Sequence, residues 1–422
     1  MSSLLLRRVR VMDESGDFPR AVDVLAEDGV ITKLGPDLPA PRGAAEFDGA
    51  DRFLMPGVID CHAHVGMSSS DSWENLNTPY SLRILQTARN LRTMLSSGVT
   101  FVRDAGGVDA GVRDALRQGL IEGPEMQVAV ALLCQTGGHM DTFLPGEGVA
   151  VSTEGFMPAY PGRPDFVVDG PDEMRRAVRQ VIRAGADWIK LCATGGIFGG
   201  VSGALAPQLS PGEINTAVYE ARKAGRPVMV HAVGGEGATW AIEAHCRSLE
   251  HGVYLTEEQI ALMQEHGTFF VPTLTVYHRL AALAAAPDSP LPPALVQSGK
   301  KLGAQLGESV RMAREAGVPI ALGIDSAEAA THGHSLEEIY WLCRAGLPIG
   351  EALLAATRTG AQLCGVDDTR GVLKPGYRLD ALLLKGDPSD PAVFREGNPA
   401  DAVFLAANVS NNFLRKTTRK PL

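Results

Sequence analysis

Short apolar runs alternate with longer amphipathic segments through the middle of the chain. From Val58 onward eight apolar runs can be counted, and most precede a segment whose apolar residues recur with helical spacing. Repeated strand and helix units of this kind are typical of a parallel sheet. The eight predicted strands are 58–60, 99–102, 126–133, 188–192, 227–231, 248–251, 268–271 and 319–324. The pattern therefore predicts an α/β protein built on a (β/α)8 TIM barrel, whose reactive groups lie at the carboxyl ends of the strands.

The segments between these runs predict the helices. We expect helices over 81–95, 171–184, 211–224 and 256–265, and one long helix over 294–316. Two more, 335–343 and 349–363, follow the last strand, and the first begins with a Ser-x-x-Glu pattern that predicts a capping box. The Ala- and Pro-rich stretch 280–293 predicts part of a loop over the barrel mouth. An open doubly wound sheet is the alternative fold, and the lack of a Gly-x-Gly-x-x-Gly after an early strand disfavours it.

Both ends of the chain have a different pattern, of short strands broken by turns. Residues 4–11, 21–26 and 30–34 predict strands, with the turn signal Glu27-Asp28-Gly29 before the last. Residues 371–376 and 380–386 return to strand and turn. We therefore expect segments 1–55 and 366–422 to form one composite β-sandwich domain beside a barrel domain that spans 56–365.

Composition restricts the classes of partner. The net charge of -10 argues against nucleic acid and anionic membrane surfaces, since both require clustered Lys and Arg. No run of about 18 apolar residues predicts a membrane span, and the first residues lack the pattern of a secretory signal. The six cysteines show no paired spacing, which suits a reducing compartment. These features predict a cytoplasmic protein with a small-molecule substrate.

Two histidines close the first predicted barrel strand. His62 and His64 follow the apolar run that begins at Met55-Pro-Gly-Val-Ile. On a strand, residues two apart point to the same face, so both imidazoles can approach one point. Neutral imidazole is the commonest side-chain ligand of transition metals. The alternative is that these are two loop histidines without a function. The remaining residues of the sequence decide between the two interpretations.

Lys190 lies in the apolar run 187–192, which is buried if it is a barrel strand. Burial disfavours the ammonium form and makes the neutral amine available. The amine could form a Schiff base with a carbonyl substrate, or it could capture carbon dioxide as a carbamate whose two oxygens bridge two metal ions. A lysine that extends out of the strand end to solvent is the structural alternative.

Three more ligand-competent side chains end later predicted strands: His231, His251 and Asp325. Each has an ordinary alternative when it is considered alone, namely a satisfied core histidine or, for Asp325, a helix N-cap. A carboxylate that emerges from a buried strand requires a cation or several donors. Six such groups at one end of a barrel predict a site for two divalent metal ions. Zinc is the default ion for this set, although manganese, cobalt and iron accept the same ligands.

The order His-x-His, strand Lys, His, His, Asp resembles the amidohydrolase superfamily in its binuclear subtype with a carboxylated lysine. Further likeness lies in Gly137-Gly-His-Met-Asp141, Ile189-Lys-Leu-Cys-Ala-Thr-Gly-Gly196, Glu250-His-Gly252 and Gly371-Val-Leu-Lys-Pro-Gly376. These motifs resemble the imidazolonepropionase-like branch, which contains Xaa-Pro dipeptidases, carboxypeptidase-type dipeptidases and ochratoxin-hydrolysing amidases. The likeness runs through nearly the whole chain.

This resemblance implies a ligand set and a reaction. His62, His64 and Asp325 would hold the more buried ion, His231 and His251 would hold the outer one, and Lys190, as N6-carboxylysine, would bridge both. A hydroxide that bridges the ions would attack a carbonyl carbon, and Asp325 would pass the proton to the leaving amine. His139, after the third strand, would polarise the carbonyl or stabilise the oxyanion. A loop histidine without a role is the alternative for His139.

Tyr277 and Arg279 in the seventh loop are candidate substrate contacts, because they could meet a substrate carboxylate. His332 is a further candidate, and together with His334 it forms a second His-x-His motif. Val233 occupies the position two residues after the fifth-strand ligand, where related enzymes often carry an aromatic residue or a histidine. The Pro-rich insert 142–166 predicts a lid or a pocket wall. Neither histidine of the second pair is expected to be a primary ligand.

The resulting prediction is a metal-dependent hydrolase that cleaves the amide of a dipeptide or an N-acyl amino acid. Relatives also assemble, so a homo-oligomer is expected. A cyclic-amide hydrolase of the imidazolonepropionase or hydantoinase kind is the alternative within the superfamily. A Schiff-base aldolase that uses Lys190 and a barrel with only a binding role are the alternatives from other classes.

Overall fold

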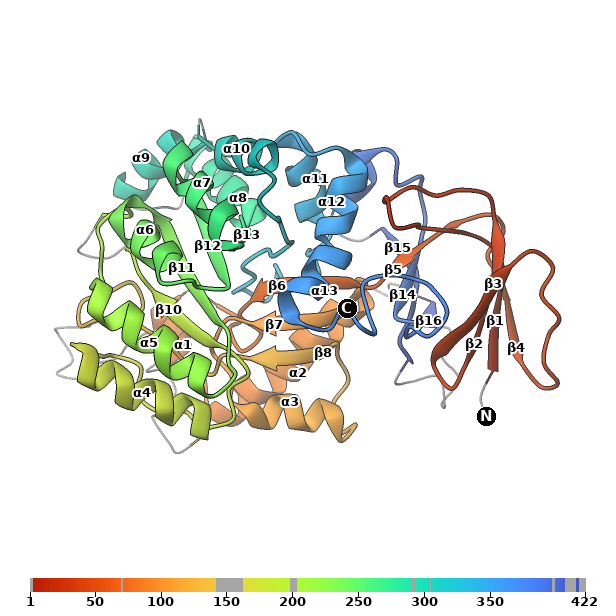
Figure 1. The fold of residues 1–422 in the computed structure, drawn as a ribbon, viewed down its shortest axis with the longest axis horizontal. Helices are drawn as coiled ribbons and strands as arrows, with labels where there is room; N and C mark the ends of the chain where they lie inside the picture. Colours follow the sequence, from red (N-terminus) through yellow and green to blue (C-terminus); the bar gives the residue numbers. More distant parts are fainter. Residues whose placement is uncertain are drawn as a thin grey trace.

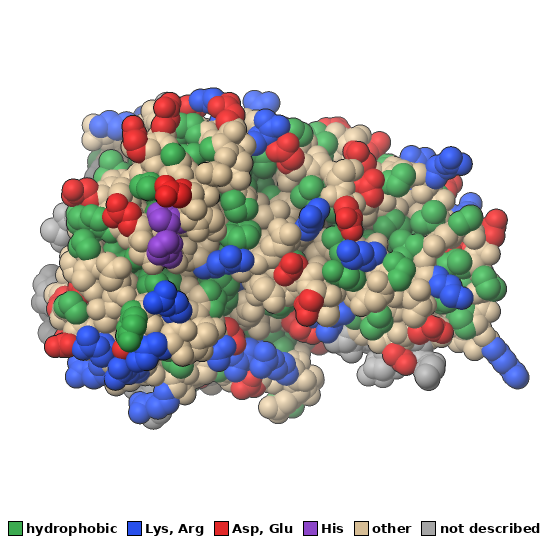
Figure 2. Space-filling view, in the orientation of Figure 1, with side chains coloured by type: hydrophobic (Ala, Val, Ile, Leu, Met, Phe, Trp, Pro, Cys, Tyr) green, Lys and Arg blue, Asp and Glu red, His purple; other side chains and the backbone are tan. Residues whose placement is uncertain are grey.

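The computed structural model describes residues 3–69, 71–141, 162–197, 203–289, 291, 293–303, 305–396, 399–406 and 415–416. It is an α/β structure in which the strands of the chain ends lie at one side of a larger helical part (Figure 1). Most of the insert predicted to be a lid, residues 142–161, lies outside the described residues. Acidic and basic side chains are distributed over both parts on the face that Figure 2 shows.

Two parallel sheets hold the central strands. The three-stranded sheet contains β6 (Val58–Ala63), β7 (Val99–Asp104) and β8 (Glu125–Val128). The five-stranded sheet contains β9 (Leu132–Leu133), β10 (Ile189–Cys192), β11 (Val228–Gly234), β12 (Ser248–Tyr254) and β13 (Phe269–Val271). These strands confirm seven of the predicted runs. The third run is divided into β8 and β9 because Val130, with φ 67°, takes a left-handed conformation between them.

The prediction of an eighth strand over 319–324 was wrong, because this segment forms no regular strand. The segment nevertheless lies between β13 and β6. Ile320 forms a single parallel bridge with Phe270, and Ser326 forms one with Ala63. Between these bridges the amide of Cys61 donates to the carbonyl of Leu322 at 2.8 Å. The segment therefore links β13 to β6 through isolated hydrogen bonds, and no continuous ladder forms.

Helices follow most of these strands and pack against them (Figure 1). They are α1 (Ser72–Asn77), α2 (Tyr80–Ser96), α3 (Ala110–Arg117), α4 (Pro171–Arg183), α5 (Pro211–Lys223), α6 (Gly235–Glu243), α7 (Glu257–His266), α8 (Leu274–Ala285), α9 (Pro293–Leu302), α10 (Glu308–Ala316), α11 (Glu337–Arg344), α12 (Ile349–Ala355) and α13 (Arg358–Cys364). Capping boxes begin α5, with Ser210, and α7, with Thr256, as the helical pattern of those segments requires. The predicted helices α2, α4, α5 and α7 are confirmed within two residues at each end.

Several helix predictions were wrong. The expected helix 294–316 is two helices, because Gly307, with φ 94°, adopts a backbone conformation that a helix interior excludes. Residues 349–363 also divide, into α12 and α13, at Thr357. The expected loop 280–293 contains the last turns of α8. Ser335 caps no helix, since its hydroxyl donates to Asp60 Oδ2 at 2.7 Å.

One further sheet joins both ends of the chain. Its members are β1 (Ser3–Val11), β2 (Val22–Glu27), β3 (Val30–Gly35), β4 (Ala45–Asp48), β5 (Phe53–Pro56), β14 (Ala381–Leu384), β15 (Ala400–Phe404) and β16 (Arg415–Lys416). The order β16-β15-β14-β5-β1-β2-β3, with β4 on β1, places carboxyl-terminal strands against amino-terminal ones. Residues 371–376, predicted to include strand, form none. Within the described residues, no helix is long and apolar enough to cross a membrane.

Candidate metal centre

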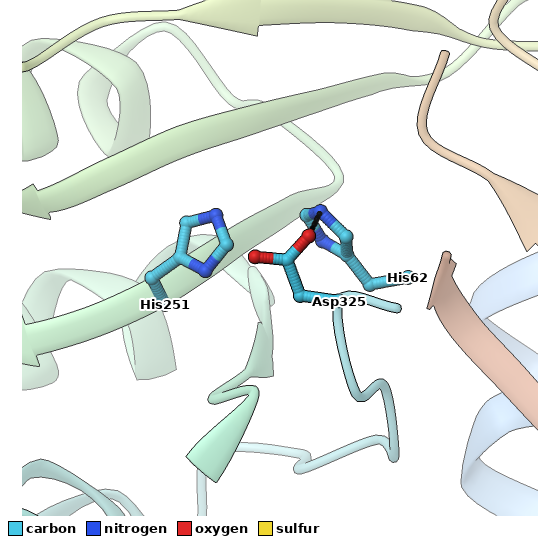
Figure 3. Close-up of side chains that lie close together, drawn as sticks. All are labelled: His62, His251 and Asp325. Carbon is cyan, nitrogen blue, oxygen red and sulfur yellow. Dashed lines mark ion pairs between the residues drawn. The ribbon is translucent and has the colours of Figure 1, made fainter. Parts of the chain in front are cut away.

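Three predicted ligands from distant parts of the chain converge at one point. His62 lies near the end of β6, His251 lies in β12, and Asp325 follows the linking segment 319–324 (Figure 3). One donor atom from each side chain lies within 4.8 Å of the others. This is the spacing of side chains that can share an ion, and both histidines are buried.

His64 completes the first part of this group. Its Nε2 lies 3.2 Å from Asp325 Oδ1, and the Nε2 of His62 lies 3.6 Å from the same oxygen. Both imidazoles therefore reach one carboxylate, which confirms the geometric prediction that the two side chains share a face.

His231 joins the group through His251. Their ring centroids lie 4.5 Å apart, and that of His251 lies 4.9 Å from that of His62. The strands β6, β11 and β12 thus bring four imidazoles together, although His231 and His251 lie in the middle of β11 and β12 and not at their ends. Neighbouring parallel strands place residues of similar position side by side. The repeated strand and helix units of the sequence therefore predict that these imidazoles come together.

The fourth element of the centre is the amine of Lys190 on β10. The residue is 1% exposed, and Nζ has no hydrogen-bond partner among the described residues. Burial lowers the pKa of this amine, which favours its neutral form. A buried amine without a partner is costly, so the site fits a lysine whose nitrogen is modified or binds a ligand.

Hydrogen bonds to the far nitrogen of each ring orient the four histidines. The contacts are His62 Nδ1 to Glu250 Oε2 at 2.7 Å, His64 Nδ1 to the Gly106 carbonyl at 2.9 Å, His251 Nδ1 to Thr273 Oγ1 at 2.8 Å, and His231 Nε2 to the Gly195 carbonyl at 3.0 Å. Carboxylates and carbonyls only accept, so the bonded ring nitrogens of His62, His64 and His231 donate, whereas the hydroxyl of Thr273 can pair with His251 in either direction. This is the support that metal-binding histidines require.

Two of the converging residues have a left-handed backbone. His251 has φ 76° and Asp325 has φ 57°, values that are uncommon for residues other than glycine. At His251 the change of backbone direction interrupts the alternation of β12, whose Glu250 already points inward to His62. Strain of this kind persists where the surrounding structure fixes it, and it is concentrated at functional sites.

The electrostatics suit a cation. Burial lowers the pKa of His62, His231 and His251, so these rings are neutral at pH 7. Burial alone would raise the pKa of Asp325, but its hydrogen bond with His64 and its electrostatic interactions with His62, His64 and Lys190 lower it overall. Burial also opposes the charged form of His64, whose pKa Asp325 nevertheless raises. The three neutral imidazoles beside an ionised carboxylate form a donor set that divalent transition metals accept.

His139 lies against this group. Its ring stacks on that of His231 with centroids 4.1 Å apart and planes 17° apart, and burial lowers its pKa to about 4. Gly196 makes the room, because a Cβ there would lie 2.1 Å from His139 Cε1. The sequence predicted the histidine and missed this role of the glycine.

The predicted substrate contacts fall into two groups. Tyr277 is buried with its ring centroid 5.8 Å from that of His251, so it lies beside the candidate centre. Val233 is fully buried in the apolar cluster that contains Tyr277. Arg279 is held by Glu337, with Nη2 2.6 Å from Oε2, and His332 is buried with Nε2 2.8 Å from the Met67 carbonyl. Those two side chains have protein partners already.

The amidohydrolase family model matches residues 53–413, which include every predicted ligand. The chain belongs to the amidohydrolase family. This amidohydrolase is 35% identical to the ochratoxinase of Aspergillus niger over 396 residues, which cover 90% of this chain and 81% of that one. It is 25% identical to the imidazolonepropionase of Mycolicibacterium smegmatis over 422 residues, 92% of this chain and 90% of that one.

Solved structures give the same result for the amidohydrolase. A prolidase complexed with N-methylphosphonate-L-proline matches with a TM-score of 0.86 and 32% identity over 96% of this chain and 98% of that one. A Xaa-Pro dipeptidase with bound methionine matches with a TM-score of 0.84 and 28% identity over the same shares. The chain is therefore a hydrolytic enzyme that acts on amide bonds, as the sequence predicted.

Proposed function

We propose that this enzyme is a binuclear metal-dependent hydrolase that cleaves the amide bond of a dipeptide or an N-acyl amino acid. The observation that carries the proposal is the convergence of His62, His251 and Asp325 within 4.8 Å, beside a buried lysine amine without a partner. The relatives described as ochratoxinase, prolidase and Xaa-Pro dipeptidase support the substrate class.

In this proposal six residues hold two divalent ions, with zinc as the default. His62, His64 and Asp325 hold one ion, and His231 and His251 hold the other. Lys190, carboxylated on Nζ, would supply two further oxygen ligands, which would give its nitrogen, without a partner among the described residues, a function. When bound, the ions supply positive charge that polarises a carbonyl and lowers the pKa of water at the site.

The side chains perform the proton transfers. Asp325, ionised and partly open to solvent with 19% of its side chain exposed, accepts a proton from the attacking water and returns it to the leaving amine. His139 is neutral at pH 7, so one ring nitrogen can donate to the oxygen that becomes negative in the transition state.

We also propose that the two parallel sheets close into a (β/α)8 barrel. The linking segment 319–324 joins β13 to β6 on one side. On the other side the amides of Asp187 and Trp188 donate to the carbonyl of Val128, which joins β8 to the residues before β10. With this barrel over 56–365, segments 1–55 and 366–422 form a separate β domain.

The test is hydrolysis by metal-loaded enzyme of a panel that contains Xaa-Pro, Xaa-Lys and Xaa-Phe dipeptides, ochratoxin-like amides, hydantoins and imidazolones. We expect turnover of linear amides with a free α-carboxylate at least 100-fold above that of the cyclic amides. Preference for the cyclic amides would replace the proposal with the imidazolonepropionase-like alternative, which the 25% identical relative represents. Borohydride trapping of a carbonyl substrate on Lys190, in the absence of metal, would instead favour a Schiff-base aldolase.

Assembly and location complete the proposal: a homo-oligomer in the cytoplasm. No disulfide joins any of the six cysteines, all of which lie within the described residues, and this agrees with a reducing compartment. Light scattering of the purified protein tests the assembly, and a monomer at micromolar concentration would contradict it.

A further inference from the structure

We propose that Arg103 and Glu250 form a buried positioning pair that sets the orientation and tautomer of His62. This inference rests on the proposed function, because it assigns a role to residues that support one of the proposed metal ligands. Within the described residues, the side-chain hydrogen bonds of the pair reach one proposed ligand, His62, while the charges of both residues also act on Lys190.

Glu250 reaches His62 from across the centre. Its Oε2 lies 2.7 Å from His62 Nδ1, and the two side chains are 0% and 1% exposed. Since a carboxylate accepts the proton, Nδ1 of His62 donates and Nε2 keeps its lone pair directed at Asp325, 3.6 Å away. On the ring nitrogen that points away from Asp325 or the other ligands, the other three histidines bond to neutral oxygens of Gly106, Gly195 and Thr273, so at this nitrogen His62 alone among the four has a charged partner.

Arg103 fixes the carboxylate. Its Nη2 lies 2.9 Å from both oxygens of Glu250, and its Nη1 donates to Ser248 Oγ at 2.9 Å. The hydroxyl of Ser248 in turn donates to Glu250. Each oxygen of the carboxylate is therefore held by at least two partners, and the acceptor aimed at His62 cannot rotate.

The guanidinium of Arg103 is itself held by β6, by β12 and by Trp188, the residue before β10. Its Nε donates to the carbonyl of Cys61, the residue before His62, at 2.5 Å. The group lies over the ring of Trp188, 4.5 Å from the centroid, and the indole of Trp188 donates to Gln127 Oε1 at 2.7 Å. The pair thus ties β7 and β12 to β6 at the residue that precedes the ligand.

The cost of burying charge means that Arg103 and Glu250 depend on each other. Arg103 and Glu250 are both fully buried, and a buried charge that loses its partner is strongly destabilising. Replacement of a buried ion pair by apolar residues is often neutral for stability. The free energy of folding alone therefore gives no strong reason for the pair, whereas a metal-binding histidine requires such a partner on its far nitrogen.

The experiment compares metal affinity, measured by competition with a chelator, in wild type, Glu250→Gln and the double variant Arg103→Met/Glu250→Leu. The Gln variant keeps an acceptor for His62 and loses the charge, so we expect about 10-fold weaker binding. The double variant removes both the acceptor and the buried charges, so it should fold and bind about 100-fold more weakly. At saturating metal, kcat should fall in both variants while KM changes by less than about twofold, since the pair touches no substrate.

Asp380→Asn is the matched control. Asp380 is 5% exposed and paired with the equally buried Arg370, but it lies beside the sheet of the chain ends. We expect it to lower the melting temperature and to leave metal affinity within about twofold of wild type. Wild-type affinity in the double variant would overturn the inference, as would an equal loss of affinity in Asp380→Asn. A wild type that binds no metal would overturn the proposed function itself, which is a distinct result.

Discussion

The ring of His139 stacks on the ring of His231, with centroids 4.1 Å apart. Gly196 permits this contact, since a Cβ would overlap the His139 ring. Gly196→Ala should therefore displace His139 and lower kcat by about 100-fold, the effect of removing one oxyanion donor. Gly203→Ala, where a Cβ meets nothing within 4 Å, is the control and should keep wild-type kcat. Equal rates in both variants would show that the position of His139 does not matter.

Lys190→Ala should remove the bridging group and reduce hydrolysis by at least 100-fold, a loss within the range for nucleophile activation by a metal site. Short carboxylic acids such as acetate should restore part of the rate, because they supply two oxygens in the cavity that the side chain leaves. Lys300→Ala, in α9, is the control. Full activity of the Lys190 variant without added carboxylate or bicarbonate would exclude the carbamate.

Tyr277 and Arg279, which the sequence predicted in a loop and the structure places in α8, should behave differently. Tyr277 is buried beside His251, so loss of its hydroxyl in Tyr277→Phe should lower kcat/KM about 10-fold, the value of one hydrogen bond of about 1.4 kcal/mol. Arg279 is neutralised by Glu337, so Arg279→Met should change KM by less than about twofold. A KM that rises in Arg279→Met and not in Tyr277→Phe would contradict this prediction and would assign the contact with the substrate carboxylate to Arg279.

Glu338 predicts a pH dependence of stability. Its carboxylate accepts from Leu274 N and from Thr275 N and Oγ1, yet burial raises its pKa to about 8, from an ordinary value of 4.5. The folded state therefore binds the proton more tightly than the unfolded state, and the stability that this proton supplies is present below pH 4.5 and is lost as pH rises to 8.

Glu338→Gln removes that titration. Between pH 5 and 8 the unfolding free energy of wild type should fall relative to the variant by at most about 1.4 kcal/mol per pH unit, and the difference should level above pH 8. Urea unfolding of metal-free protein across this range measures it. A difference that stays constant with pH would mean that Glu338 is ionised in the folded state.

Much of the candidate centre could be predicted from the sequence, because its ligands are the last residues of apolar runs and parallel strands bring such ends together. His62, His64, His231 and His251 follow from that rule. The rule does not give the direction of a side chain where the backbone departs from a strand. Asp325 follows a segment that forms no ladder, and its left-handed backbone is fixed by tertiary contacts.

The remaining misses have a common cause in long-range partners. Ser335 resembles a helix cap in the sequence, yet its hydroxyl bonds to Asp60, 275 positions away. Glu250 and Arg103 are 147 positions apart, and they form a pair because β12 and β7 bring their side chains together in space. Local pattern predicts elements and their ends, whereas the partners of buried polar groups depend on which elements become neighbours.

The central claim is that six side chains come together to bind two cations. The metal content of wild type and of Lys190→Ala, measured side by side, tests this claim most directly. Elemental analysis of wild type, purified without chelator and saturated with zinc, should give about two ions per chain. Lys190→Ala should lose at least one of them and regain it with a short carboxylic acid. A wild type that binds no divalent ion, or a Lys190 variant that holds two without added carboxylate, would contradict the account.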